Sequence, residues 1–471
     1  MRRRDTLAWL AATPWLGGVK AQPTTSVFAA EDLALAQALR ERGLEDGLAY
    51  SLVQSLCTEV GARPAGSAAD GRAVQWALAQ FKRMGFDKVR AEAMPLRVWQ
   101  RGPAQARITS PVEHPLVMTA LGNSVGTPEG GLEAEIAYYA DLAALKADGS
   151  EAARGRIVFI DQKTERTRDG RGYGFAVLAR IAGAVDAARR GAIAVAIRSI
   201  GTDADRVAHT GAMRYDPQVA QIPAFAVSVP DADFIAQLHA QGGAPLRLRF
   251  TLQARHDVAA TTHNVIAEVP GGDLADEIVL ISAHLDSWDL GQGALDDGAG
   301  VGIVSAAAKL ILDLGARPRR TVRVVLWGNE ENGFDGANAY GERYKDVVHQ
   351  MVGESDFGGG RIWQFRHRVR AEALPAVEAI AQALLPLSIP RPDSGANEGA
   401  AGPDGTLLMR RHRWPAMQLS QDGSNYFDVH HTVNDTLDKV DPATLPHNVA
   451  AWSVVAWLAA MAPVRFGPWQ S

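Results

Sequence analysis

The sequence predicts an α/β protein: a three-layer domain with a mostly parallel, mixed central sheet flanked by helices, and a smaller α/β domain inserted into it. Three observations support this class. Short apolar runs alternate with helical patterns from Asn264 onward, which is typical of parallel strands joined by helices. A similar alternation of shorter elements runs from Asn123 to Thr251. The 471 residues exceed what one hydrophobic core usually holds, so two domains are expected.

Composition places the chain among ordinary globular proteins and excludes some partners. Hydrophobic residues make up 47% and charged residues 21% of the sequence. The net charge of -5 provides no basic surface, which argues against nucleic acid as a partner. The single cysteine, Cys57, excludes an internal disulfide framework and a cysteine-based zinc cluster.

The N-terminus has the pattern of a signal peptide over residues 1–21. Arg2–Arg4 form a positive segment, Leu7–Val19 is mostly apolar but too short to span a bilayer, and Val19-Lys20-Ala21 resembles a cleavage site. We therefore expect the mature protein to be periplasmic or secreted. The sequence leaves open whether export uses the general secretory route or the twin-arginine route. No later stretch reaches the length of a transmembrane helix, so no membrane span is expected.

Residues 22–122 are expected to form the N-terminal part of the larger domain. Helical periodicity runs through Ala29–Arg42, Leu44–Val60 and Asp70–Met84. Phe86–Val98 reads as extended, and Arg97–Gly130, rich in proline and glycine, as irregular. The first helices either pack on the catalytic sheet or form a homodimer interface, and the sequence leaves both open.

Residues 123–251 read as an inserted α/β domain with elements of its own. Expected strands are Glu135–Tyr139, Arg156–Asp161, Ala192–Ile197, Ala224–Ser228 and Leu246–Leu252. Expected helices are Tyr173–Arg190 and Asp231–Gln241. This region lacks the clusters of His, Asp and Glu found later in the chain. It is either an inert spacer or a wall of the cleft that limits substrate length, and the sequence leaves both open.

Residues 252–471 are expected to form the main part of the larger domain, which is the one that carries the candidate site residues described next. Its expected strands are Asn264–Val269, Glu277–Ser282, Thr321–Trp327, His349–Gly353 and Pro415–Leu419. Its expected helices are Gly298–Leu314, Phe334–Tyr344, Ala371–Leu385 and Ala443–Met461. The longer elements predict the larger of the two sheets, with helices on both faces.

Four polar stretches each follow an expected strand of this part. They are the loop with His284, Asp286, Asp289, Asp296 and Asp297; Asn329-Glu330-Glu331; Glu354-Ser355-Asp356; and Tyr426–Leu437. Parallel strands bring their carboxyl ends to one edge of a sheet, so these side chains are expected to converge.

Two imidazoles and several carboxylates without a thiol suit zinc or another borderline divalent metal. Five ligands hold two ions if one carboxylate is shared. Glu330 and Glu331 are adjacent and cannot share one role, so one should bind metal and the other should act as general base. Each stretch alone is more often a solvated loop or a helix cap. Their repetition at four strand ends is what favours a metal site.

The ordered motifs resemble the M28 family of co-catalytic zinc aminopeptidases and carboxypeptidases, and within it the carboxypeptidase Q branch. The matching stretches are H-L-D-S-W-D-L-G-Q-G-A-L-D-D-G-A-G, N-E-E-N-G, E-S-D and H-H-T-V-N-D-T, with G-A-R-P-A-G-S nearer the N-terminus. The resemblance implies a zinc-aminopeptidase-like fold with an inserted protease-associated domain.

The resemblance also implies a role for each residue of the motifs. His284 and Asp356 would bind one zinc ion, Glu331 and His431 a second, and Asp296 both. Glu330 would be the general base. The supporting residues would be Asp286, which orients His284, and Asp297, joined to Asp296 by a cis peptide bond. The residues expected to line the substrate pocket are His430, Asp404 (in a loop) and Tyr426.

The implied activity is hydrolysis of N-terminal peptide bonds in short, unblocked peptides. A hydroxide bridging two zinc ions would attack the scissile carbonyl, with Glu330 moving the proton. Two alternatives stay open. One is glutaminyl-cyclase-like acyl transfer with a single zinc ion, and the other is a non-catalytic, receptor-like metal-binding protein.

Overall fold

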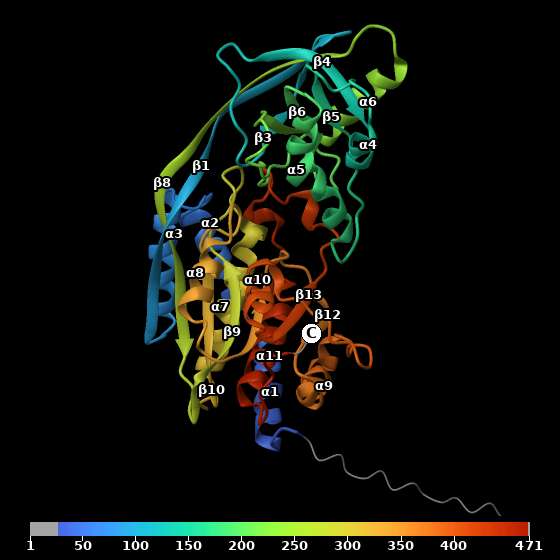
Figure 1. Cartoon of the computed structure of the whole chain (residues 1–471). Coiled ribbons are helices and arrows are strands. Elements are labelled where there is room, and N and C mark those ends of the chain that lie inside the picture. Colours follow the sequence, from blue (N-terminus) through green and yellow to red (C-terminus); the bar gives the residue numbers. More distant parts are fainter. Residues whose placement is uncertain (1–26, 470–471) are drawn as a thin grey trace, which may run out of the picture.

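The computed structural model describes residues 27–469, which form two lobes joined by a pair of long strands (Figure 1). The main lobe is defined here by the strand order β12-β13-β11-β9-β10-β8, and the second lobe by the order β4-β5-β6-β7-β3. The signal peptide expected over residues 1–21 lies outside the described residues.

The main sheet is mixed and mostly parallel, as expected. β9, β10, β11 and β13 run parallel, while β8 and β12 are antiparallel to their neighbours. The strands are β8 (Arg247–Val269), β9 (Leu274–His284), β10 (Arg320–Trp327), β11 (His349–Glu354), β12 (Ile362–Arg368) and β13 (Ala416–Gln421). β9 and β10 are buried along most of their length, which explains their nearly continuous apolar sequence.

Helices cover both faces of the main sheet and make it a three-layer lobe. One face carries α1 (Ala30–Gly43), α2 (Leu48–Glu59), α3 (Ala68–Arg83), α7 (Ala299–Leu312), α9 (Leu374–Leu384) and α11 (Leu445–Met461). The other face carries α8 (Asp335–Arg343) and α10 (Gly402–His412). The N-terminal helices therefore pack in the core of this lobe. Within residues 27–469, no helix combines the length and the apolar character needed to cross a membrane.

The lobes are joined by β1 (Lys88–Ser110) and β8, which pair antiparallel along nearly their whole length (Figure 1). The expectation that residues 97–130 are irregular is wrong for its first part, because β1 continues to Ser110. Register shifts between Val98 and Gln100 and between Arg101 and Ala104 accommodate Gly102-Pro103 within the strand pair. The two strands expected at 246–252 and 264–269 are likewise one strand, β8.

The second lobe is a smaller α/β layer structure. Its parallel strands are β4 (Leu132–Tyr139), β5 (Ile157–Ile160), β6 (Ala194–Arg198) and β7 (Ala224–Val227), and β3 (Met118–Ala120) pairs antiparallel with β7. The helices are α4 (Leu142–Ala147), α5 (Arg171–Arg189) and α6 (Val229–Gln241), and β2 (His114–Leu116) pairs with β1. β3 precedes residue 123, and residue 251 lies inside β8, so this lobe draws on residues beyond 123–251.

One buried histidine of the main sheet gives the fold a testable pH dependence. His349 on β11 stacks on Trp414 at 3.6 Å, and its Nε2 lies 2.9 Å from the Tyr340 hydroxyl. Burial lowers the pKa of His349 from 6.5 to about 3. Unfolding lets the ring take up a proton, so the stability from the neutral ring is present above about pH 6.5 and is lost as the pH falls towards 3.

We expect His349 to account for about 2 kcal/mol of the stability lost between about pH 7 and about pH 5. Urea unfolding at both pH values measures this contribution. The free energy of unfolding of His349→Gln should fall between the two pH values by this amount less than that of the wild type. His256→Gln, at an exposed position, should behave as the wild type. Equal falls for wild type and His349→Gln would contradict the assignment.

Candidate metal centre

The residues predicted to bind metal lie at one edge of the main sheet. His284 ends β9, Glu331 follows β10, and Asp356 follows β11. Asp296 lies in the short turn η1 (Ala294–Gly298) before α7, and His431 follows the turn η4 (Tyr426–Asp428). β9, β10 and β11 are adjacent and parallel, so their carboxyl ends meet, as expected for an α/β sheet.

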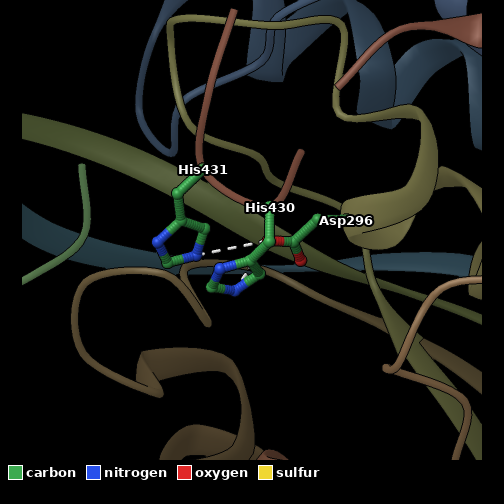
Figure 2. A group of neighbouring side chains, drawn as sticks. All are labelled: Asp296, His430 and His431. Carbon is green, nitrogen blue, oxygen red and sulfur yellow. Dashed lines mark ion pairs between the residues drawn. The ribbon is translucent and has the colours of Figure 1, made fainter. Parts of the chain in front are cut away.

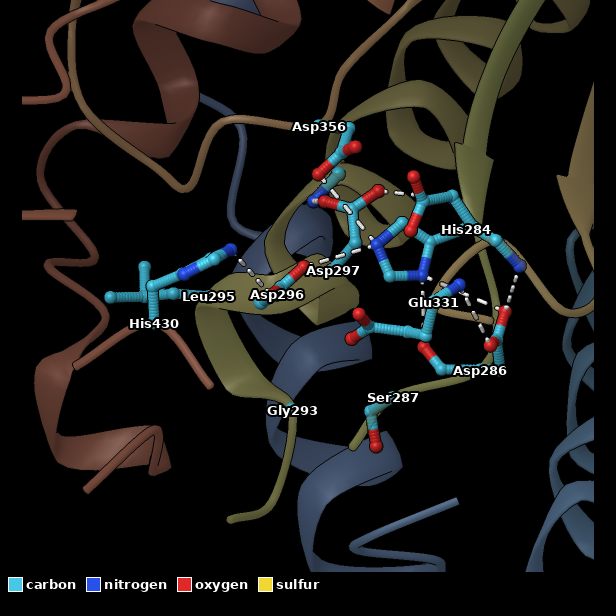
Figure 3. Close-up of polar contacts among 12 residues, drawn as sticks. His284, Asp286, Ser287, Gly293, Leu295, Asp296, Asp297, Glu331, Asp356 and His430 are labelled. Carbon is cyan, nitrogen blue, oxygen red and sulfur yellow. Dashed lines mark hydrogen bonds and ion pairs between the residues drawn. The ribbon is translucent and has the colours of Figure 1, made fainter. Parts of the chain in front are cut away.

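Asp296 lies between two histidines and faces each with a different oxygen. Its Oδ1 is 3.1 Å from His284 Nε2, and its Oδ2 is 3.2 Å from His431 Nε2. Figure 3 shows Asp296 pointing towards His284, and Figure 2 shows it beside His430 and His431. A carboxylate in this position can contribute one oxygen to each of two ions. The peptide bond between Asp296 and Asp297 is cis, as expected.

The remaining carboxylates differ in the histidine that they face. Glu331 Oε2 lies 3.1 Å from His431 Nε2, while Asp356 Oδ1 lies 3.6 Å from His284 Nε2. Glu331 is also close enough to His284 and Asp296 to hold an ion together with them. The ion pair with His431 favours Glu331 as its partner in a second metal site that shares Asp296.

His430 is the second imidazole near Asp296 and competes with His431 as a ligand. The rings of His430 and His431 are stacked at 3.5 Å, and His430 Nε2 lies 3.4 Å from Asp296 Oδ2. Both histidines form a buried group with Asp296 that is compact enough to hold an ion. Among residues 27–469, Glu331 forms an ion pair with the ring of His431 and not with that of His430, which favours His431 as the ligand.

The donor set fits divalent cations on electrostatic grounds. Burial, together with neighbouring carboxylates, raises the pKa of both Glu330 and Glu331 well above their usual range. Glu331 Oε1 is buried and has no hydrogen-bond partner among residues 27–469. Buried carboxylates at this density need either protons or a compensating positive charge. Two imidazoles and oxygen donors without a thiol match zinc.

Asp286 and Asp297 support the loops around the centre. The Asp286 carbonyl accepts a hydrogen bond from His284 Nδ1 at 3.0 Å, and its carboxylate accepts one from the Glu330 amide at 3.0 Å. The Asp297 carboxylate accepts hydrogen bonds from the amides of His284 and Gly300. Asp286 thus orients His284 through its backbone, and its side chain positions the Glu330–Glu331 segment.

Asp435 is a supporting residue that the sequence argument left without a role. Its carboxylate accepts hydrogen bonds from the amides of Ala294, Leu295 and Asp296, at 2.7 to 3.2 Å. Burial raises its pKa to about 7. Asp435 therefore ties the segment that carries His431 to the turn that carries Asp296. Asp435 is the aspartate of the motif H-H-T-V-N-D-T, and this position in the motif is the feature of the sequence that could have indicated a role for it.

Arg63, in the G-A-R-P-A-G-S loop, fixes the conformation of the first polar loop, the one that runs from His284 to Asp297. Its side chain is fully buried and donates hydrogen bonds to the carbonyls of Leu285, Gln292 and Gly293. Its amide donates to Ser287 Oγ at 3.1 Å. These bonds link both ends of the loop between His284 and Asp296.

We expect Arg63→Met to destabilise the protein by about 3 kcal/mol or more, because it removes the donor to the carbonyls of Leu285 and Gln292 and one of two donors to the carbonyl of Gly293. Urea unfolding followed by circular dichroism measures this loss. Arg83→Met, at an exposed position near the end of α3, is the matched control and should change stability by less than about 0.5 kcal/mol. Similar stability of both variants would show that the Arg63 hydrogen bonds contribute little.

A cavity of about 430 Å³ opens onto the centre between the lobes. The main lobe contributes Asp296, Glu330, Glu331, Asp356, Tyr426, His430 and His431 to its lining. α5 of the second lobe contributes Tyr173, Val177 and Arg180, residues that no sequence pattern singled out. Asp404, expected in a pocket loop, lies instead in the first turn of α10 and is fully buried outside this lining.

Asp289, the acidic residue without an expected role, forms an ion pair outside the centre. Its Oδ2 lies 2.8 Å from Arg101 Nε on the β1 strand. The Arg101 guanidinium also donates to the Thr210 hydroxyl, in the loop between β6 and β7. Asp289 therefore connects the first polar loop to the strand that joins the lobes.

Known proteins share both this sequence and this architecture. The model of peptidase family M28 matches residues 264–456, which include all the predicted ligands. Carboxypeptidase Q of Mus musculus is 33% identical over 413 residues, covering 87% of this chain and 85% of the mouse protein.

Two solved structures support the fold. The peptidase M28 precursor of Shewanella amazonensis is 46% identical, with a TM-score of 0.90, over 94% of this chain and 99% of that one. The zinc aminopeptidase BSAP of Bacillus subtilis has a TM-score of 0.62 at 17% identity, over 90% of this chain and 98% of that one, and shares the fold. The expected zinc-aminopeptidase-like fold class is thereby confirmed. The chain belongs to peptidase family M28 and is a metallopeptidase related to carboxypeptidase Q.

Proposed function

We propose that the protein is a di-zinc exopeptidase that removes N-terminal residues from short, unblocked peptides, acting as an aminopeptidase or dipeptidase. The observation that carries this proposal is the position of Asp296 between two separate groups of donors. His284 and Asp356 would hold one zinc ion, Glu331 and His431 the other, and Asp296 both. Bound there, the two ions would lower the pKa of water and polarise the scissile carbonyl.

Glu330 is the proposed general base. It lines the cavity beside Asp296 and Asp356, and its amide is held by the Asp286 carboxylate. Glu330 would take a proton from the attacking water and pass it to the leaving amine.

The cavity supports a preference for short substrates. Its volume of about 430 Å³ suits a small molecule of the size of a di- or tripeptide. Carboxylates at its base would attract the substrate α-amine, while α5 of the second lobe closes the opposite wall. We propose that residues 123–251, which we regard as a protease-associated-like domain, limit substrate length in this way.

Hydrolysis of unblocked dipeptides, compared with their N-acetylated forms, tests the activity. We expect release of the N-terminal amino acid only from the unblocked peptides, loss of activity with a chelator, and recovery with zinc. Activity that persists after complete metal removal would contradict the proposal. A metal content of one zinc ion per chain would instead favour the single-zinc cyclase chemistry.

We also propose that the mature protein is exported after cleavage near Ala21. The supporting pattern, a basic segment followed by a short apolar one, lies in residues 1–21 of the sequence. Intact-mass measurement of exported protein should show a chain that begins near residue 22. An exported chain that still begins at Met1 would refute this.

A further inference from the structure

The segment that carries His430 and His431 is held from both lobes. Its far end is bound to the main lobe through the Asp435 carboxylate, as described above. Its near part is bound to the loop between β6 and β7 of the second lobe. There the Thr202 amide donates to the Phe427 carbonyl at 3.1 Å, and the Thr210 amide donates to the His431 carbonyl at 3.0 Å.

We propose that the second lobe positions His431 for metal binding, with His209 and Thr210 as the positioning residues. This inference rests on the proposed di-zinc function. It assigns to the second lobe a role in assembling one of the two metal sites, in addition to forming a wall of the cavity.

The Thr210 carbonyl orients the His431 ring. His431 Nδ1 lies 3.3 Å from this oxygen and 3.5 Å from Arg180 Nη1, which itself donates to the same oxygen at 3.2 Å. Because a carbonyl oxygen can only accept, the shorter contact of His431 places a hydrogen on Nδ1. A hydrogen on Nδ1 leaves the Nε2 lone pair free, and Nε2 faces Asp296 and Glu331. A ligand histidine is normally held by a carbonyl or carboxylate in this manner. Here that carbonyl belongs to the second lobe.

His209 holds the backbone next to His431. Its Nδ1 donates to the His430 carbonyl at 2.8 Å, and its Nε2 lies 2.7 Å from Asp203 Oδ1. Both side chains are buried, with exposures of 1% and 4%. A Cβ at Gly201 would collide with the His209 ring, so the pair is enclosed tightly and has little freedom to move. Because the buried His209–Asp203 pair cannot move freely, the hydrogen bond from His209 Nδ1 fixes the position of the His430 carbonyl, which belongs to the other lobe.

The other proposed metal site does not depend on this contact. His284 is oriented by the Asp286 carbonyl, at 3.0 Å, and Asp356 follows β11, so both belong to the main lobe. Loosening the contact made by His209 should therefore weaken the site of His431 and Glu331 and spare the site of His284 and Asp356. A general loss of stability would not produce this difference between the two sites.

The test is zinc titration of the metal-free, full-length protein against a competing chelator. In His209→Ala, we expect one of two zinc affinities to fall by about 10- to 100-fold, with the other changed by less than about 3-fold. His209→Asn, whose side-chain amide nitrogen stands in the place of Nδ1 and can donate to the His430 carbonyl, should recover most of the loss. Gly201→Ala displaces the His209 ring without removing it and should have the same effect as His209→Ala. If His209→Ala does not fold, Gly201→Ala serves as the test variant.

Arg198→Ala is the matched control. Arg198 forms a buried ion pair with Asp161 in the second lobe, at 2.6 Å, with exposures of 4% and 5%. It belongs to β6 rather than to the loop that contacts the histidine segment, so this variant should lower the melting temperature and keep both zinc affinities.

Two results would overturn the inference. One is wild-type affinity for both ions in folded His209→Ala and Gly201→Ala, and the other is an equal loss in Arg198→Ala. Failure of the proposed function is seen separately, because a wild-type protein that binds one zinc ion, or that hydrolyses no dipeptide, refutes the di-zinc peptidase whatever the variants do.

Discussion

Replacing Glu330 by glutamine is expected to lower kcat for dipeptide hydrolysis by about 100- to 10,000-fold, the range that general base catalysis contributes. The amide keeps the shape of the side chain but cannot accept the proton of the attacking water. Because Glu330 lies beside the proposed ligands and is not one of them, zinc content and melting temperature should match those of the wild type. Steady-state kinetics and elemental analysis on the same preparation measure both quantities.

Glu331→Gln is the informative control, since it changes the neighbouring carboxylate in the same way. It should lower the zinc content towards one ion per chain, because Glu331 faces His431 at 3.1 Å. If Glu330→Gln retains kcat within about 10-fold of the wild type, Glu330 is not the base. If Glu330→Gln loses zinc and Glu331→Gln does not, the two roles are exchanged.

Replacing Asp296 by asparagine is expected to weaken both zinc sites by more than about 100-fold. Its two oxygens face His284 and His431 separately, and an amide offers one oxygen of lower charge. Changes in residues that only support ligands already cost about 10- to 100-fold in metal affinity, so loss of a shared ligand should exceed that range. Zinc titration in the presence of a chelator measures both affinities.

Two histidine variants complete this comparison. His431→Gln should lose one zinc ion, whereas His430→Gln should keep two, although the rings are stacked at 3.5 Å. If Asp296→Asn removes a single ion and leaves the other at wild-type affinity, Asp296 is not shared. If His430→Gln removes an ion, His430 is the ligand in place of His431.

The metal centre could be predicted from sequence because its residues stand in short motifs at strand ends. Glu331 lies in the short loop that follows β10, and the apolar run of β10 is plain in the sequence. His284 and Asp296 lie in one motif on either side of a single loop. Parallel pairing then brings the ends of β9, β10 and β11 together without further information. The choice between Glu330 and Glu331, and between His430 and His431, came from the family resemblance and not from the pattern.

The contacts between the lobes could not be predicted in the same way. Thr210 acts through its backbone carbonyl, which every residue has, so no residue type marks it. His209 and Arg180 are single polar residues in a region without clusters. An isolated histidine or arginine in a sequence does not indicate a functional site. The continuity of β1 was hidden by Gly102-Pro103, because a register shift that tolerates proline depends on the partner strand β8. Each of these features depends on which segments meet in space.

The central claim is that Asp296 joins two metal sites, and a crystal structure with anomalous scattering measured at the zinc edge tests it most directly. The expected result is two zinc peaks on either side of the Asp296 carboxylate. One should contact His284 and Asp356, and the other should contact Glu331 and His431. A single peak at full zinc loading, or two peaks that Asp296 does not bridge, would contradict the claim.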